Sequence, residues 1–76
     1  MTPGPRDVQI RDETIRLGQL LKLAGLAGSG AEARALVKDG AVHVNGEVET
    51  RRGRQLRRGD LIAAAGETIR VDRAPG

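Results

Sequence analysis

The stretch that decides the fold is residues 42–49, Val-His-Val-Asn-Gly-Glu-Val-Glu. Two runs that alternate between apolar and polar residues flank Asn45-Gly46, and Asn-Gly between such runs is the strongest short-range signal of a β-hairpin with a type I′ turn. Successive side chains of a strand point to opposite faces. The alternation therefore predicts that three valines face the core and three polar residues face outward: Val42, Val44 and Val48 inward, and His43, Glu47 and Glu49 outward.

A helix is predicted just before this hairpin. Ser29 and Glu32 have the spacing of a capping box, in which Ser29 accepts from the backbone N–H of Glu32 and Glu32 accepts from the N–H of Ser29. Ala33, Leu36 and Val37 then form an apolar stripe, and Gly40 stands where a left-handed C-terminal cap is expected. A helix of about ten residues is unstable alone, so it must pack on other elements.

The remaining elements follow from periodicity and turn residues. Leu17, Leu20, Leu21 and Ala24 lie at the i, i+3, i+4 and i+7 spacing of one helical face, and Gly25 and Gly28 bracket its end. Strands are predicted around residues 8–10, 61–63 and 68–71, and residues 14–17 continue or repeat the first of them. The fold class is α+β, with two short helices on one side of a small, mostly antiparallel sheet.

A chain of 76 residues allows one small domain. We expect it to span residues 8–72, between a flexible Pro- and Gly-rich tail at 1–7 and a second tail at 73–76. The tail at 1–7 has no apolar stretch of the kind found in a signal peptide, and no run approaches 18 apolar residues. We therefore expect a cytoplasmic protein, and a monomer.

Composition excludes several classes of function. The chain has no Cys and one His, which removes disulfides, thiolate metal sites and an imidazole cluster. It has no Phe, Trp or Tyr, which removes aromatic platforms for base stacking. At 38% hydrophobic and 30% charged residues, the chain is still too apolar and too mixed in charge to be disordered.

The positive charge is concentrated in one segment. The formal net charge is +3, and residues 51–58, Arg-Arg-Gly-Arg-Gln-Leu-Arg-Arg, contain five Arg and no acid. Without those five, the chain has eight basic and ten acidic residues. Such a segment presents a focused field to a polyanion. The alternative interpretation is a solvated loop without a binding role, which is rich in Arg because the whole chain uses Arg far more often than Lys.

The residues that could carry catalysis are few. Ser29 has a capping role, His43 has no identifiable Asp partner, and paired carboxylates such as Glu47 and Glu49 are more often a solvated strand face than an acid/base pair. We expect no enzyme activity, no cofactor and no metal site. Gly28-Ser29-Gly30 at a helix start could contribute one phosphate contact, because free N–H groups point outward there.

Nucleic acid is the partner that these features favour. Arg34 and Lys38 share a helix face at i and i+4, Lys22 lies on the polar side of the first predicted helix, and Arg16 just precedes that helix. Without aromatic rings, stacking on bases has to come from Arg. The expected recognition therefore reads phosphates and shape, which favours structured RNA or a duplex over an extended single strand.

Residues 15–62 resemble a known family. The matching features are Arg16-Leu17, Leu20-Leu21, Gly25-Leu26-Ala27, Ser29, Glu32-Ala33-Arg34, Gly40, Val42, Val44-Asn45-Gly46, Val48 and Gly59-Asp60. In combination they resemble the small RNA-binding domain named after ribosomal protein S-four, also called the alpha-L RNA-binding motif. The match covers about 48 of the 76 residues and is nearest to short, free-standing bacterial members.

The resemblance implies two helices on a small curved sheet, with RNA bound by the helix pair, the hairpin and the basic loop after it. Its RNA contacts, carried onto this chain, are Arg16, Lys22, Ser29, Arg34, Lys38, Asn45, Arg51, Arg52 and Arg54, with Arg57 and Arg58 nearby. Asn45 also has a structural role, because a type I′ turn favours Asn there. Two positions depart from the family pattern: Gly18 replaces a common Asp, and Gly30 replaces a common Arg that would contact phosphate.

The leading hypothesis is thus a small, non-catalytic protein that binds structured RNA, with ribosomal RNA or tRNA as candidates and the ribosome or a ribosomal subunit as a wider partner. The alternative is a protein-interaction module that docks on a ribosomal or other acidic protein. The absence of aromatic residues and the single Met argue against a strong protein-binding hot spot.

Overall fold

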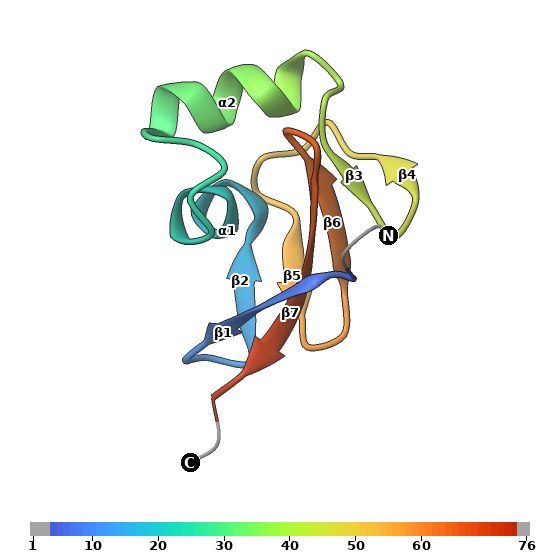
Figure 1. Ribbon diagram of the computed structural model, residues 1–76. Helices are drawn as coiled ribbons and strands as arrows, with labels where there is room; N and C mark the ends of the chain where they lie inside the picture. Colours follow the sequence, from blue (N-terminus) through green and yellow to red (C-terminus); the bar gives the residue numbers. More distant parts are fainter. Residues whose placement is uncertain (1–3, 75–76) are drawn as a thin grey trace.

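The computed structural model describes residues 4–74. Its elements run in the order β1 (Arg6–Ile10), β2 (Thr14–Arg16), α1 (Leu17–Leu23), α2 (Gly30–Lys38), β3 (His43–Val44), β4 (Glu47–Val48), β5 (Gln55–Arg57), β6 (Leu61–Ala64) and β7 (Glu67–Arg73). The helix pair lies at one end of the molecule, and the strands extend away from it (Figure 1). The predicted α+β class is confirmed.

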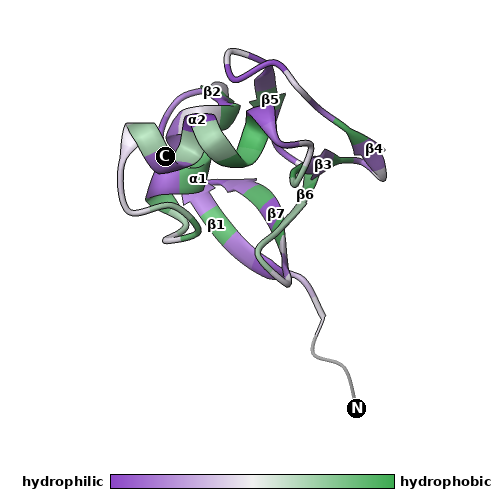
Figure 2. Cartoon of the chain, turned by 90° about the horizontal axis from the view of Figure 1, so that it is seen from above, coloured by the Kyte–Doolittle hydropathy of each residue, from purple (hydrophilic) through white to green (hydrophobic). Residues whose placement is uncertain are grey.

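The strands form two sheets. One has the order β1-β7-β6-β3-β4, and the other pairs β2 with β5. Every pairing is antiparallel except that of β1 with β7, which is parallel. In Figure 2, β1 and β7 alternate between hydrophilic and hydrophobic residues along their length, as expected for strands with one buried face.

Arg6 and Asp7 belong to β1, although we predicted a tail up to residue 7, and Arg73 belongs to β7, although we predicted a tail from residue 73. The rest of the two predicted tails, at residues 1–3 and 75–76, lies outside the described residues.

The core is aliphatic and lies between the helices and the sheets. The largest of its fully buried side chains are Leu17, Leu20, Leu21, Leu56, Ile62, Ile69, Val37, Val42 and Val71. The predicted faces of both helices are confirmed, since Leu17, Leu20 and Leu21 are buried on α1 and Ala33 and Val37 on α2. Neither helix in the described part of the chain has the length and apolarity needed to cross a membrane.

The cap of α2 is confirmed in one half and wrong in the other. The Ser29 hydroxyl accepts from the N–H of Glu32 at 3.2 Å, as predicted. The Glu32 carboxylate, however, accepts from the N–H of Gly28 at 2.7 Å and not from that of Ser29. A Cβ at residue 28 would lie 3.2 Å from Glu32 Oε2, so the missing side chain of Gly28 lets the carboxylate approach.

The hairpin forms around the predicted turn, with positive φ at Asn45 and Gly46, but two of its faces were predicted wrongly. Val48 is 54% exposed and Glu49 is buried. The register explains both, because a two-residue turn pairs Val44 with Glu47 and His43 with Val48. Directly paired residues share a face, so Val44 and Val48 lie on opposite faces of the hairpin.

Candidate nucleic-acid interface

The loop at residues 51–54 is fixed to the start of α1 by backbone hydrogen bonds. Leu17 donates to the carbonyl of Arg54 at 2.8 Å, and Gly18 donates to the carbonyl of Arg52 at 3.0 Å. Leu17 and Gly18 begin α1 and therefore have no acceptor within their own helix. The Arg-rich segment is thus not a free loop: its first half docks on a helix end, and its second half contains β5.

Glu49 holds the same loop through hydrogen bonds from Arg51 and Arg54. Its side chain is 7% exposed and accepts from Nε of Arg51 at 3.1 Å and from Nη1 of Arg54 at 2.8 Å. It also accepts from the backbone N–H of Arg51. The hydrogen bonds from Arg51 and then Arg54 lower the pKa of Glu49 from 4.5 to about 2. Glu49, predicted to face solvent, is therefore the ionised anchor of the loop.

The same contacts divide the five arginines of residues 51–58. Arg51 and Arg54 share the single carboxylate of Glu49, and Arg58 lies 3.4 Å from Asp72 on β7. Arg57 donates its backbone N–H to Asp60, whose carboxylate closes the turn before β6. The side chains of Arg52 and Arg57 form no ion pair with a carboxylate within residues 4–74.

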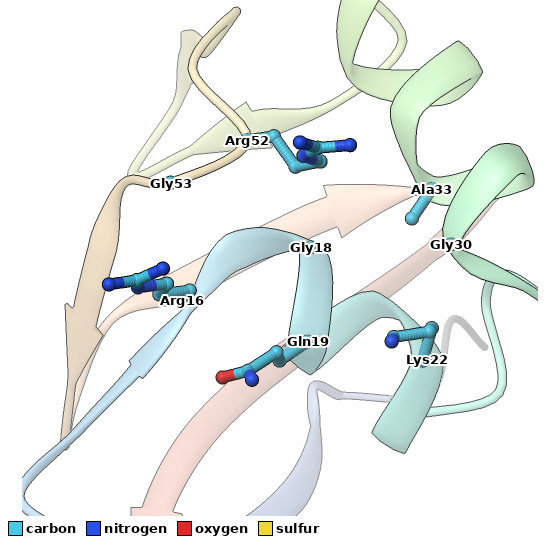
Figure 3. A pocket seen from close by; sticks show the side chains of 8 residues that line it. All are labelled: Arg16, Gly18, Gln19, Lys22, Gly30, Ala33, Arg52 and Gly53. Carbon is cyan, nitrogen blue, oxygen red and sulfur yellow. The ribbon is translucent and has the colours of Figure 1, made fainter.

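Arg52 crosses the start of α1, where Gly18 makes room for it. A Cβ at residue 18 would lie 2.7 Å from Cγ of Arg52. The side chain of Arg52 thus reaches a pocket of about 270 Å³ between α1, the start of α2 and the loop. Its lining residues are Arg16, Gly18, Gln19, Lys22, Gly30, Ala33, Arg52 and Gly53 (Figure 3). Three predicted contacts, Arg16, Lys22 and Arg52, are brought together there from three segments.

Two further predicted contacts extend from this pocket along α2. Gly30, Arg34 and Lys38 follow at intervals of four, so they lie along one side of the helix. Arg34 and Lys38 are exposed. We call Arg16, Lys22, Arg34, Lys38 and Arg52 the cationic face. Within residues 4–74, none of these five forms an ion pair with a carboxylate.

Apart from the side chain of Arg57, the other predicted contacts have structural partners. The Asn45 amide donates to Asp60 Oδ1 at 3.2 Å, and its oxygen accepts from the N–H of Leu61 at 2.9 Å. Asn45 thereby ties the hairpin to the turn before β6, beyond its role in the type I′ turn. The Ser29 hydroxyl caps α2. Arg58 lies with Asp7, Arg70 and Asp72, away from the pocket that Arg52 lines.

Sequence reasoning missed the positioning role of Glu49 and the glycines of the pocket. The signal for Glu49 was present, because it precedes Arg51 by two positions and Arg54 by five. That signal was overlooked because strand alternation assigned Glu49 to the outward face. Gly18 and Gly30 drew notice as departures from a family pattern, and only the folded chain shows that both line one pocket.

The arrangement offers positive charge and N–H donors. None of the eight lining residues of the pocket is acidic or a histidine. Within residues 4–74, no group of three or more acidic residues and histidine could hold a metal ion.

Comparison with known proteins shows which family this chain resembles. A model of the S4 domain family matches residues 8–72. The chain is 39% identical over 57 residues to the Putative RNA-binding protein YbcJ of Escherichia coli, covering 75% of this chain and 81% of that protein. It is 42% identical over 59 residues to the Probable ribosome maturation protein RlbA of Bacillus subtilis, covering 78% and 83%.

The solved structures agree with these matches. The solution structure of E. coli YbcJ, described as revealing an alpha-L motif involved in RNA binding, has a TM-score of 0.62 with this chain at 32% identity. The similarity covers 90% of this chain and 85% of YbcJ. The family-model match, the related sequences and the shared fold identify this chain as a member of the S4 domain family.

Proposed function

We propose that this protein binds structured RNA through the cationic face and catalyses no reaction. The observation that carries the proposal is the convergence of Arg16, Lys22 and Arg52 on a pocket without a carboxylate. Cations that lack protein partners are available to phosphates, whereas a paired arginine has to exchange one anion for another. The names of YbcJ and RlbA support RNA as the partner.

The RNA we propose is ribosomal RNA in a folded region, bound by a monomer in the cytoplasm. The name of RlbA, a ribosome maturation protein, favours the ribosome or its subunits over tRNA. The chain has no aromatic residue, so binding rests on phosphates and on the shape of the RNA rather than on stacked bases.

The test is the salt dependence of binding to a folded ribosomal RNA fragment, measured by fluorescence anisotropy. A triple variant with Arg16→Gln, Lys22→Gln and Arg52→Gln should reduce the slope of log K against log salt by about 2–3, at ~0.7–0.9 for each phosphate that is no longer neutralised. The matched control, with Arg6→Gln, Arg58→Gln and Arg70→Gln, removes the same formal charge from paired arginines. Its slope should stay near that of the unmodified protein.

Equal slopes for the two triple variants would show that net charge, and not the cationic face, determines binding. Co-sedimentation with ribosomal subunits, with and without nuclease treatment, addresses the alternative partner. Retention on a nuclease-treated protein fraction, together with no salt-sensitive binding to the RNA fragment, would instead indicate docking on a protein.

A further inference from the structure

The pocket beneath Arg52 is open because three of its lining residues are glycines. A Cβ at Gly30 or Gly53 would have no heavy atom within 4 Å, so both positions border empty space. Gly18 is the exception, since a Cβ there would meet Cγ of Arg52 at 2.7 Å and displace that side chain. Gly18 therefore keeps Arg52 in place, while Gly30 and Gly53 leave the space in front of it unfilled.

The open space is surrounded by donors. Arg16 comes from the end of β2, Lys22 from α1 and Arg52 from the loop, and Gln19 adds an amide (Figure 3). The first turn of α2 also begins at the pocket, with Gly30 as its first residue. The first N–H groups of a helix have no partner within it and carry the positive end of its dipole.

The size and chemistry of the pocket limit what it can hold. Its volume of about 270 Å³ is many times the ~10–15 Å³ that a cavity needs to hold one water. Ala33 offers only a methyl group, and no aromatic ring is available to hold a base. Arg forks and a Lys ammonium suit the tetrahedral oxygens of a phosphate.

We propose that this pocket is an anchoring subsite for one phosphate group of the bound RNA. The inference rests on the proposed RNA binding and adds where a single phosphate is held. The phosphate is either a terminal phosphomonoester or an internal phosphodiester at a sharp bend, since both present the same oxygens. Gly18 and Gly30, the two positions that depart from the family pattern, together leave this space available to a ligand.

The deciding variant is Gly30→Glu, which places a carboxylate in the pocket. The fold should tolerate it, because a Cβ at residue 30 meets nothing within 4 Å and an acid is favourable in the first turn of a helix. The matched control is Gly4→Glu, which makes the same charge change at a residue with open space around it and outside the pocket. Urea unfolding of both variants checks that each is folded.

Two readouts test the subsite. In amide NMR spectra, inorganic phosphate should shift the signals of Gly18, Gln19 and Gly53 in the unmodified protein and in Gly4→Glu, and leave them unshifted in Gly30→Glu. In RNA titrations, Gly30→Glu should lower the salt slope by the share of one phosphate, ~0.7–0.9, relative to Gly4→Glu. Tighter binding of a 5′-phosphorylated RNA hairpin than of its 5′-hydroxyl form indicates a terminal phosphate, and equal binding indicates an internal one.

The two proposals fail differently. If the unmodified protein binds RNA and the Gly30→Glu and Gly4→Glu variants bind with equal affinity and slope, the subsite is wrong and the RNA-binding function stands. If the unmodified protein shows no salt-sensitive RNA binding, both are wrong.

Discussion

The helix side and the β1–β7 side of the molecule both carry basic side chains, but those on the β1–β7 side are paired with carboxylates and, in the part of the chain that the structure describes, those on the helix side are not. On the β1–β7 side, each of four arginines lies within 4 Å of a carboxylate: Arg6 with Glu67, Arg58 with Asp72, Arg70 with Asp7 and Arg73 with Glu13. On the helix side, the five cations of the cationic face have no such partner within residues 4–74. The difference shows that the partners of the arginines, rather than their number, locate the candidate site.

Sheet register accounts for the neutral side. The parallel pairing of β1 with β7 sets Asp7 directly opposite Arg70, and their side chains meet at 2.7 Å. Opposite charges at directly paired positions attract across the strands. On the helix side, the acid closest in sequence to the pocket, Glu32, is already bonded to the backbone of Gly28. Four arginines of the β1–β7 side are paired with carboxylates, whereas the cationic face has no such pair within residues 4–74.

The largest expected effect comes from Glu49, which pairs with Arg51 and Arg54 in the loop that also carries Arg52, unpaired within residues 4–74. Glu49→Ala removes the acceptor of both Arg51 and Arg54 from a buried site, and it should lower the free energy of unfolding by about 1–3 kcal/mol. It should also raise the salt dependence of RNA binding, because Arg51 and Arg54 lose their carboxylate and become available to phosphates. Urea unfolding measures the first and anisotropy the second. Glu47→Ala, in an exposed position of the same hairpin, is the control and should change unfolding by less than ~0.5 kcal/mol.

Acid should remove, without a mutation, the stabilisation that Glu49 provides, because it protonates the carboxylate. The pKa of Glu49 is about 2 in the folded protein, below its usual 4.5, so the unfolded chain binds this proton first as the pH falls. The stabilisation from Glu49 is therefore complete above pH 4.5 and is lost as the pH falls through about 2. Urea midpoints measured from pH 7 to pH 2 should fall more steeply for the unmodified protein than for Glu49→Gln. Parallel curves would contradict the ion pairs.

A smaller effect should follow from releasing an arginine on the neutral side. Asp7→Asn removes the carboxylate that holds Arg70, a carboxylate whose pKa is lowered mainly by the hydrogen bond from Arg70. The freed arginine can then take a phosphate, so the salt slope of nonspecific duplex binding should rise by up to ~0.9. Asp12→Asn removes the same charge from an exposed residue and should leave the slope unchanged. A rise in both variants would mean that only net charge matters.

The smallest effect is expected at Val48, which can be compared with the buried Val44 on the other face of the same hairpin. Val48 is 54% exposed, so Val48→Thr should change the free energy of unfolding by less than ~0.5 kcal/mol. Val44 is 2% exposed, and Val44→Thr buries a hydroxyl at a cost of about 1–3 kcal/mol. Thermal or urea unfolding separates the two. A larger loss at Val48 would mean that the hairpin has another register.

The sequence was sufficient for features that depend on neighbours in the chain. The Ser29 cap, the buried faces of α1 and α2, the Gly40 terminus and the Asn45-Gly46 turn all arise from interactions over a few residues. Even the error at Val48 was avoidable, because a two-residue turn fixes the register and hence the faces.

The rest depends on residues that are far apart in sequence. Nothing near Asp7 indicates Arg70, which lies 63 positions away. The parallel alignment of β1 with β7 that brings them together has no local signature. The pocket likewise needs α1, α2 and the loop at once. The sequence therefore predicted which basic residues could bind an anion, but it could not show which of them are already paired with a carboxylate of the protein.

The pairing of β1 with β7 also affects the order in which the chain can fold as it leaves the ribosome. The two helices and the hairpin are close together in sequence, so they can pack on one another before the β1–β7 pairing forms. The first strand has to wait, because its partner is synthesised some 63 residues later. Until β7 arrives, Val8 and Ile10 are without their place in the sheet, and closing so long a loop has an entropic cost. We therefore expect the β1 edge to join the fold last, after translation has passed residue 73.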